Sequence, residues 1–213
     1  MNFDQFLKAI SKIKNLPLPA EASQFKMSPP FRIELLKRQK AAMKNPNRAG
    51  VLALFYPDKA HQTKLILILR RTYNGVHSAQ VGFPGGKIEP QDDSFEMAAV
   101  RETYEEVGVP IQDIEVLKPL TEVYIPPSNF YVKPFFGICK KTPNFVKEES
   151  EVEALIEVDL THFMDDAVLI SKMVETSYSI KVEVPAFKLN GHVVWGATAM
   201  MLSEIKDLLK QML

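Results

Sequence analysis

Three glutamates lie within one helical turn near the middle of the chain: Glu102, Glu105 and Glu106. At about 100° per residue, their spacing places all three carboxylates on one face of a helix. Carboxylates this close repel one another, and a bound divalent cation reverses that repulsion. Mg²⁺ and Mn²⁺ prefer oxygen ligands, and Mg²⁺ is commonly shared with substrate phosphates. The cluster therefore indicates metal-dependent chemistry on a phosphate group, and the alternative interpretation is a solvated acidic helix face.

The sequence around these glutamates predicts a helix over residues 93–107. Asp92, Asp93 and Ser94 provide N-cap oxygens and negative charge at the positive end of the helix dipole, and Gly108 is typical of a helix stop. Four apolar residues recur on the side away from the carboxylates: Met97, Val100, Tyr104 and Val107. We expect that side to face the core and the glutamates to lie on the open side.

Residues outside this helix are candidates for binding phosphate or for moving a proton. Arg70 and Lys87 flank a Phe-Pro-Gly-Gly turn at 83–86, where their charges would reach a phosphate, although surface exposure alone also explains them. His77 is either a phosphate or proton-transfer group or a residue that orders its loop. Ser128 lies in a proline-rich loop, and we interpret it as a substrate contact because no Ser-His-Asp spacing is recognisable.

The elements that must position these residues are a mixture of strands and helices. Apolar runs of strand length occur at residues 50–56, 65–69, 111–117, 130–139, 153–158 and 180–187. Helices are predicted at residues 2–14, from about 29 to 43, at 93–107 and at 198–213. Elements in this order predict an α/β or α+β sandwich. We expect residues 1–45 to form an N-terminal helical extension and residues 46–213 to form one domain.

The composition excludes several classes of function. The 26 basic and 26 acidic side chains give a formal net charge of zero, so no long-range field attracts nucleic acid or an anionic membrane. Cys139 is the single cysteine, so no internal disulfide can form and a reducing compartment is expected. The N-terminus lacks the apolar core of a signal peptide, and no apolar stretch approaches the roughly 18 residues that span a bilayer. We therefore expect a cytoplasmic protein that acts on a small molecule.

The segment from Gly86 to Val109 resembles the Nudix box, written Gx5Ex7REUxEExGU with U a bulky aliphatic residue. The second half of the motif is matched by Arg101, Glu102, Glu105, Glu106, Gly108 and Val109. Asp93 stands eight residues before Arg101, where the motif has Glu, and Thr103 replaces the first aliphatic residue. The resemblance implies a Nudix-type α/β/α sandwich with a mixed sheet. It also implies Mg²⁺ or Mn²⁺ held by the three glutamates and the Gly86 carbonyl, with Arg101 and Asp93 orienting the loop and helix.

Further segments resemble the coenzyme A pyrophosphatases of this family: residues 70–86, 124–134, 151–160 and 195–199. Gly75 and Ala79 depart from that subfamily, which often has arginine and glycine there. The resemblance implies water attack on a diphosphate phosphorus of coenzyme A or acyl-CoA, which releases 4′-phosphopantetheine and adenosine 3′,5′-bisphosphate. It also implies that Glu151 assists as a further metal ligand or as the general base. The alternative for Glu151 is an ordinary exposed acid in the charged run 147–151.

Two alternative functions follow from the same residues. The first is Nudix hydrolysis of another nucleoside diphosphate derivative, such as ADP-ribose, a dinucleotide or a nucleoside triphosphate. The second is a Nudix-fold module that senses a nucleotide without hydrolysing it. The complete set of glutamates argues against the second alternative, because loss of a glutamate would be its expected sign. No oligomeric state is predicted.

Overall fold

The structure is a computed structural model that describes residues 1–28, 32, 45–71, 80–175 and 181–213. The larger of two sheets contains β1 (Asn47–Pro57), β2 (Thr63–Arg70), β3 (Val81–Gly82), β4 (Gly85–Lys87), β5 (Ile114–Pro119), β6 (Val123–Ile125), β7 (Phe130–Cys139) and β8 (Val152–Asp159). The smaller sheet contains β9 (Leu169–Glu175), β10 (Lys181–Leu189) and β11 (His192–Val194).

The described α-helices are α1 (Phe3–Ala9), α2 (Ala20–Gln24), α4 (Phe95–Val107), α5 (Leu160–Met164) and α6 (Gly196–Lys210). Short 3₁₀-helices occupy Ile10–Asn15, Phe25–Met27, Ile111–Asp113, Pro126–Ser128 and Asp166–Val168. Among the described residues, no helix combines the length and the apolar character that a membrane span requires.

The larger sheet is mixed. Its strand order is β3-β2-β1-β7-β5, with β4 paired to β1, β6 to β7 and β8 to β2. β1 and β7 run parallel, with Ala53 opposite Phe136, whereas the other described pairings of this sheet are antiparallel. The pairing of β1 with β4 places Gly50 opposite Gly86, which brings the glycine turn beside the longest strand.

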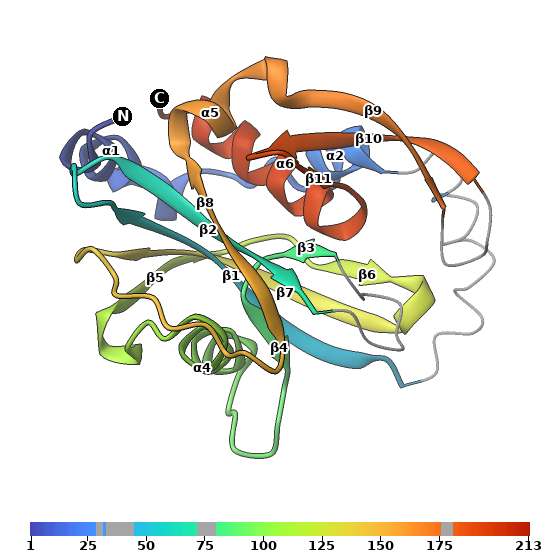
Figure 1. Ribbon diagram of the computed structural model, residues 1–213, viewed down its shortest axis with the longest axis horizontal. Coiled ribbons are helices and arrows are strands. Elements are labelled where there is room, and N and C mark those ends of the chain that lie inside the picture. The colour runs from blue at the N-terminus through green and yellow to red at the C-terminus, as the bar shows by residue number, and fades with distance from the viewer. Residues whose placement is uncertain (29–31, 33–44, 72–79, 176–180) are drawn as a thin grey trace.

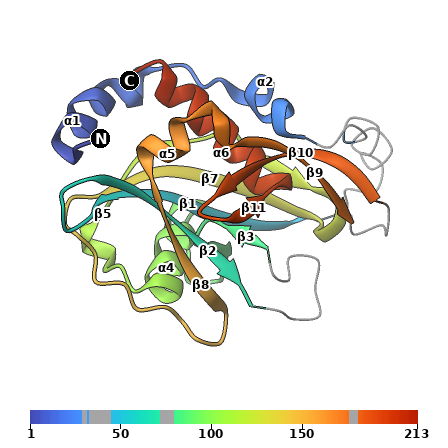
Figure 2. The ribbon, with the colours of Figure 1, turned by 45° about the horizontal axis from the view of Figure 1, so that its top comes forward.

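Helices cover both faces of the larger sheet, with α4 on one face and α1, α2 and α6 on the other (Figures 1 and 2). Leu52 and Leu54 of β1 pack in a hydrophobic cluster with α4, whereas Ala53 and Phe55 pack in a larger cluster with α6. Alternate residues of a strand point to opposite faces, so a strand that is apolar throughout requires a helical layer on each side. This arrangement confirms the predicted α/β/α sandwich with a mixed sheet.

The N-terminal residues pack into the core on the α6 face. The Phe6 ring lies 5.2 Å from the Phe55 ring, measured between centroids. In α2, Gln24 Nε2 donates a hydrogen bond of 3.0 Å to Glu204 Oε2 of α6. Residues 1–27 therefore share a hydrophobic core with the sheet that follows them.

All six predicted strands are present, five of them with shifted ends. The first of the predicted helices is divided into α1 and the 3₁₀-helix Ile10–Asn15. The helix predicted from about 29 to 43 lies outside the described residues except for Arg32. α2, α5, β3, β4, β6, β9 and β11 were not predicted. Four of these strands have two or three residues, which is too short for an alternating pattern to be recognised.

Candidate active site

α4 is seated on the sheet through small residues. Ser94 caps its N-terminus by accepting a hydrogen bond from Met97 N at 3.1 Å, and Gly108 ends it with φ 76°, both as predicted. A Cβ atom at Gly50 of β1 would lie 2.0 Å from the Phe95 carbonyl oxygen. Only glycine therefore lets helix and strand approach this closely.

This close approach decides which side of α4 is buried. The residues that face inward are Ala98, Ala99, Thr103, Glu106 and Val107. Met97 and Tyr104 are 45% and 51% exposed, so the prediction that they face the core was wrong. Their large side chains cannot enter the narrow gap between α4 and β1, and the helix is rotated so that small residues and Glu106 point inward. The expectation that all three glutamates lie on the open side was therefore wrong for Glu106.

Glu106 is a buried carboxylate held against the glycine turn. Its side chain is 1% exposed, and Oε2 accepts a hydrogen bond from Gly85 N at 2.7 Å. Oε1 lies 3.3 Å from Arg70 Nη2, yet it has no hydrogen-bond partner among the described residues. Burial raises the pKa of Glu106 to about 7, against the opposing effects of the Arg70 charge and the Gly85 N–H.

Glu102 lies directly over Gly86. A Cβ atom at Gly86 would come within 2.3 Å of Glu102 Cδ, so the absence of a side chain at position 86 leaves room for the carboxylate. Burial raises the pKa of Glu102, and the neighbouring Arg101 charge opposes that change. The Gly86 backbone and the Glu102 carboxylate are therefore close enough to share one ligand.

Arg101 connects α4 to the loop that precedes it. Its Nε and Nη2 atoms donate to the two oxygens of Asp92, at 3.0 and 2.9 Å. Nη2 also donates to the Lys87 carbonyl oxygen at 3.1 Å, and Nη1 donates to Glu105 Oε2 at 2.8 Å. The hydrogen bonds from Arg101 lower the pKa of Asp92.

The partner of Arg101 is therefore Asp92, and the prediction of Asp93 was wrong. Asp93 is exposed. Five residues separate Gly86 from Asp92, as in the motif, and the additional residue lies between Asp92 and Arg101. Counting from the glycine identifies Asp92, whereas counting back from Arg101 identifies Asp93.

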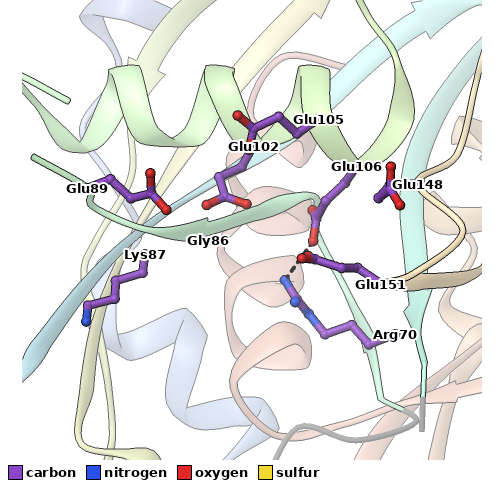
Figure 3. A pocket seen from close by; sticks show the side chains of 9 residues that line it. All are labelled: Arg70, Gly86, Lys87, Glu89, Glu102, Glu105, Glu106, Glu148 and Glu151. Carbon is purple, nitrogen blue, oxygen red and sulfur yellow. Dashed lines mark ion pairs between the residues drawn. The ribbon is translucent and has the colours of Figure 1, made fainter. Parts of the chain in front are cut away.

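The carboxylates of α4 line an open pocket of about 280 Å³ (Figure 3). Its lining residues are Arg70, Gly86, Lys87, Glu89, Glu102, Glu105, Glu106, Glu148 and Glu151. Six of the nine lining residues are glutamates and two are basic, so a fully ionised lining is strongly negative. The negative charges of Glu102 and Glu151 both contribute to the raised pKa of Glu106.

A loop before β8 brings two of these glutamates to the pocket. Glu148 N donates to the Glu106 carbonyl oxygen at 3.0 Å, and Val146 N donates to the Val107 carbonyl oxygen at 3.1 Å. The loop thus satisfies carbonyl groups in the last turn of α4. Glu148 and Glu89 were not predicted as site residues; the acidic run 148–151 was a signal for the first, and we find none for the second.

The other predicted residues divide into three groups. Glu151, Arg70 and Lys87 line the pocket beside the α4 glutamates. Ser128 is half-buried in the 3₁₀-helix after β6 and is not among the lining residues. His77 lies outside the described residues, as do Gly75 and Ala79.

The donor chemistry of the pocket fits a hard divalent cation. Within residues 1–28, 32, 45–71, 80–175 and 181–213, no three His, Cys, Asp or Glu side chains already converge as a metal site. The lining nevertheless supplies carboxylate oxygens, a buried Glu106 oxygen that lacks a hydrogen bond, and a glycine over which Glu102 lies. Oxygen donors of this kind suit Mg²⁺ or Mn²⁺ and are a poor match for softer metals.

Comparisons with known proteins agree with this geometry. The chain matches the family profile described as NUDIX domain over residues 46–174. It is 28% identical over 155 residues to the peroxisomal coenzyme A diphosphatase ndx-8 of Caenorhabditis elegans, covering 72% of this chain and 64% of that protein. It is 31% identical over 160 residues to a protein of Pectobacterium atrosepticum named uncharacterized Nudix hydrolase NudL, covering 72% of this chain and 79% of that protein.

The fold also resembles a solved structure. The crystal structure of RenU, a Nudix hydrolase from M. smegmatis, superposes with a TM-score of 0.54 at 15% identity, covering 79% of this chain and 88% of that chain. This similarity concerns the fold alone. The family profile, by contrast, extends over the glycine turn, α4 and the segment that carries Glu151. The chain therefore belongs to the Nudix hydrolase family, whose members act on nucleoside diphosphate derivatives and generally use divalent metal ions.

Proposed function

We propose that this pocket hydrolyses the diphosphate linkage of coenzyme A or acyl-CoA, releasing 4′-phosphopantetheine and adenosine 3′,5′-bisphosphate, with Mg²⁺ or Mn²⁺ as cofactor. The observation that carries the proposal is the buried Glu106 carboxylate, which has one oxygen without a hydrogen bond and lies in a pocket lined by glutamates. The substrate class is supported by the coenzyme A pyrophosphatase resemblance and by the name of the Caenorhabditis elegans relative.

In this proposal, Glu102, Glu105, Glu106 and the Gly86 carbonyl hold the cation. When bound, the cation would neutralise charge on the diphosphate and lower the pKa of a water molecule. The chain supplies the positioning that accounts for most of the acceleration in phosphoryl transfer. Arg101 fixes the loop before α4 through Asp92 and the Lys87 carbonyl, so that the glycine turn and the helix keep their relative positions.

Four further residues have separate proposed roles. Glu151 accepts the proton of the attacking water or acts as a further metal ligand. The Lys87 ammonium is a charge partner for a phosphate at the pocket mouth. Ser128 and His77 are proposed substrate contacts; because Ser128 does not line the carboxylate pocket, its contact would be with a part of the substrate that extends beyond the diphosphate.

A substrate panel tests the proposal. Coenzyme A, acetyl-CoA, ADP-ribose, a dinucleotide and a nucleoside triphosphate would each be incubated with protein and Mg²⁺ or Mn²⁺, and the products identified by chromatography. We expect the highest kcat/KM for coenzyme A or its acyl ester, with the two predicted products. Preferential cleavage of another compound would replace the substrate, and tight nucleotide binding without turnover of any compound would indicate a sensing module.

A further inference from the structure

Arg70, the last residue of β2, is directed to the α4 face of the sheet by the alternation of its strand. Ile66 and Ile68 pack in the cluster with α4, whereas Leu65 and Leu67 pack on the opposite face. Because alternate residues share a face, Arg70 continues the row of Ile66 and Ile68. The pairing of β2 with β8 shifts register immediately before Arg70, and such bulges often re-aim a side chain beside an active site.

Arg70, Gly85 and Glu106 each contact the other two. The Arg70 Nη2 atom donates to the Gly85 carbonyl oxygen at 2.7 Å and lies 3.3 Å from Glu106 Oε1. The N–H of the same glycine donates to Glu106 Oε2 at 2.7 Å. One side chain thus connects β2, the glycine turn and α4, and Figure 3 shows the Arg70–Glu106 ion pair beside Glu151.

The two basic residues of the pocket differ in what they contact. Arg70 is already engaged by protein groups, and only 26% of its side chain is exposed. Lys87 is exposed, and its ammonium forms no ion pair with another described residue. A substrate phosphate therefore finds an available cation in Lys87, whereas binding to Arg70 through Nη2 would compete with Gly85 and Glu106.

We propose that Arg70 is a positioning residue, which holds the Glu106 carboxylate and the Gly85–Gly86 turn in fixed relation instead of binding a substrate phosphate. This inference rests on the proposed function, because it assigns Arg70 to the same metal-binding carboxylate. Without Arg70, the buried Glu106 would lose its nearest positive charge and Gly85 its side-chain donor, which leaves a charge uncompensated. Lysine would keep the charge, but its ammonium on a flexible stem would replace the rigid guanidinium whose Nη2 atom meets both acceptors.

The test compares Arg70→Ala and Arg70→Lys with wild-type protein and with Arg71→Ala. Arg71 is the matched control because it is adjacent in sequence and its side chain contacts Glu149 and Glu153 at the surface. Three properties are measured: Mn²⁺ binding to substrate-free protein by electron paramagnetic resonance, kcat and KM for coenzyme A, and folding by circular dichroism and thermal unfolding.

We expect Arg70→Ala to weaken Mn²⁺ binding and to lower kcat by roughly tenfold or more each, with KM close to the wild-type value. Charge alone predicts the opposite sign for the metal, because removing a cation beside carboxylates strengthens cation binding. A phosphate-binding role predicts a raised KM with unchanged Mn²⁺ binding. Arg71→Ala should match wild type in all three measurements.

The inference is overturned if folded Arg70→Ala binds Mn²⁺ as tightly as wild type or more tightly, or if only KM changes. If Arg70→Ala does not fold, Arg70→Lys decides: weakened Mn²⁺ binding supports positioning by the rigid guanidinium, and wild-type binding overturns it. Glu105→Gln separates this inference from the proposed function. If Glu105→Gln loses Mn²⁺ binding and the Arg70 variants keep it, the positioning role of Arg70 is refuted and the proposed metal site stands. If Glu105→Gln binds Mn²⁺ as wild type does, the proposed metal site itself is refuted.

Discussion

Among the residues that the structure describes, two glutamates are almost completely buried, and they differ in their hydrogen bonding. Glu204 of α6 is 0% exposed and accepts from Gln24 Nε2 at 3.0 Å, from Thr121 Oγ1 at 2.6 Å and from Thr121 N at 3.3 Å. Glu106 of α4 is 1% exposed, and one of its oxygens has no hydrogen bond. Glu204 joins the N-terminal segment to α6, whereas Glu106 lies at the pocket.

The difference shows how a structural carboxylate can be distinguished from a functional one. A buried polar group without a hydrogen bond costs about 1–3 kcal/mol, so a fold that needed Glu106 only for packing would gain by satisfying it or replacing it. Glu204 has donors for both of its oxygens and needs no ligand. The incomplete hydrogen bonding of Glu106 supports its proposed role as a metal ligand.

Removal of metal should have the largest effect on activity. It should affect the pocket that contains Glu106 and leave the surroundings of Glu204 unchanged. We expect excess EDTA to abolish turnover of coenzyme A, because the negative lining would then face the diphosphate without a cation. The fold should remain intact, since the donors around Glu204 come from the protein itself. Activity and circular dichroism would be recorded on the same samples. Full turnover with metal content confirmed as nil would refute the mechanism.

Exchanging each glutamate for glutamine should separate activity from stability. We expect Glu106→Gln to lower kcat by at least about a hundredfold, through loss of a metal-centred electrostatic interaction, while the protein stays folded. Glu204→Gln should keep kcat near wild type but lose about 1–3 kcal/mol of unfolding free energy, because an amide nitrogen would face donors. Steady-state kinetics measures kcat, and urea unfolding measures the free energy of unfolding. Similar changes in both variants would contradict the different roles assigned to Glu106 and Glu204.

Glu105→Gln should resemble Glu106→Gln in activity. We again expect kcat to fall by at least about a hundredfold. Glu105 is half exposed, so its replacement should leave the free energy of unfolding close to wild type. Near-wild-type turnover in both glutamine variants would place the catalytic site elsewhere in the molecule.

The pH dependence of stability should also distinguish the buried site. The pKa of Glu106 is raised to about 7, chiefly by burial, above the value of about 4.3 for an unfolded glutamate. Between these values the folded state holds a proton that the unfolded state has lost, so stability falls as pH rises. Relative to Glu106→Gln, the free energy of unfolding of metal-free wild-type protein should fall by on the order of 3 kcal/mol as the pH rises across this window. Urea unfolding in EDTA at several pH values is the measurement; parallel curves for the two proteins would contradict the raised pKa.

Glu151 should show a smaller effect that its neighbour Glu149 does not share. We expect Glu151→Gln to lower kcat or Mn²⁺ affinity by about tenfold, the scale for a group that assists a metal site. If Glu151 is the general base, the acidic limb of the pH–rate profile should also disappear. Glu149→Gln is the control, because Glu149 is in the same charged run but does not line the pocket. Equal, wild-type behaviour of the two variants would leave Glu151 with no catalytic role.

The local features of the site could be predicted from the sequence because they depend on residues close together in the chain. The helix with its Ser94 cap, its Gly108 stop and its glutamates follows from spacing within one segment. The rotation of α4 could not be predicted in this way. It depends on the contact of Gly50 with the Phe95 carbonyl, and Gly50 belongs to a strand that precedes the helix by many residues.

The contacts of three further residues depend on the complete fold. Asp92 and Asp93 both fit part of the motif, and only the path of the loop shows that the first meets Arg101. Arginine is a residue type that often binds phosphate, but the alternation of β2 directs the Arg70 side chain to Glu106. Glu148 lies in an acidic run, which was a signal in the sequence, but it reaches the pocket because its loop hydrogen-bonds to the end of α4, and the sequence does not indicate that contact.

The hydrogen bond from Gly85 N to Glu106 Oε2 gives the site a built-in spectroscopic reporter. The resonance frequency of an amide proton depends on the charge of its acceptor, so the NMR signal of Gly85 should differ between the protonated and the ionised carboxyl. It should move again when diamagnetic Mg²⁺ is added, and it should broaden when paramagnetic Mn²⁺ is added. A single backbone signal would then follow the ionisation of Glu106 and the arrival of the ion in the resting protein, before any substrate is present.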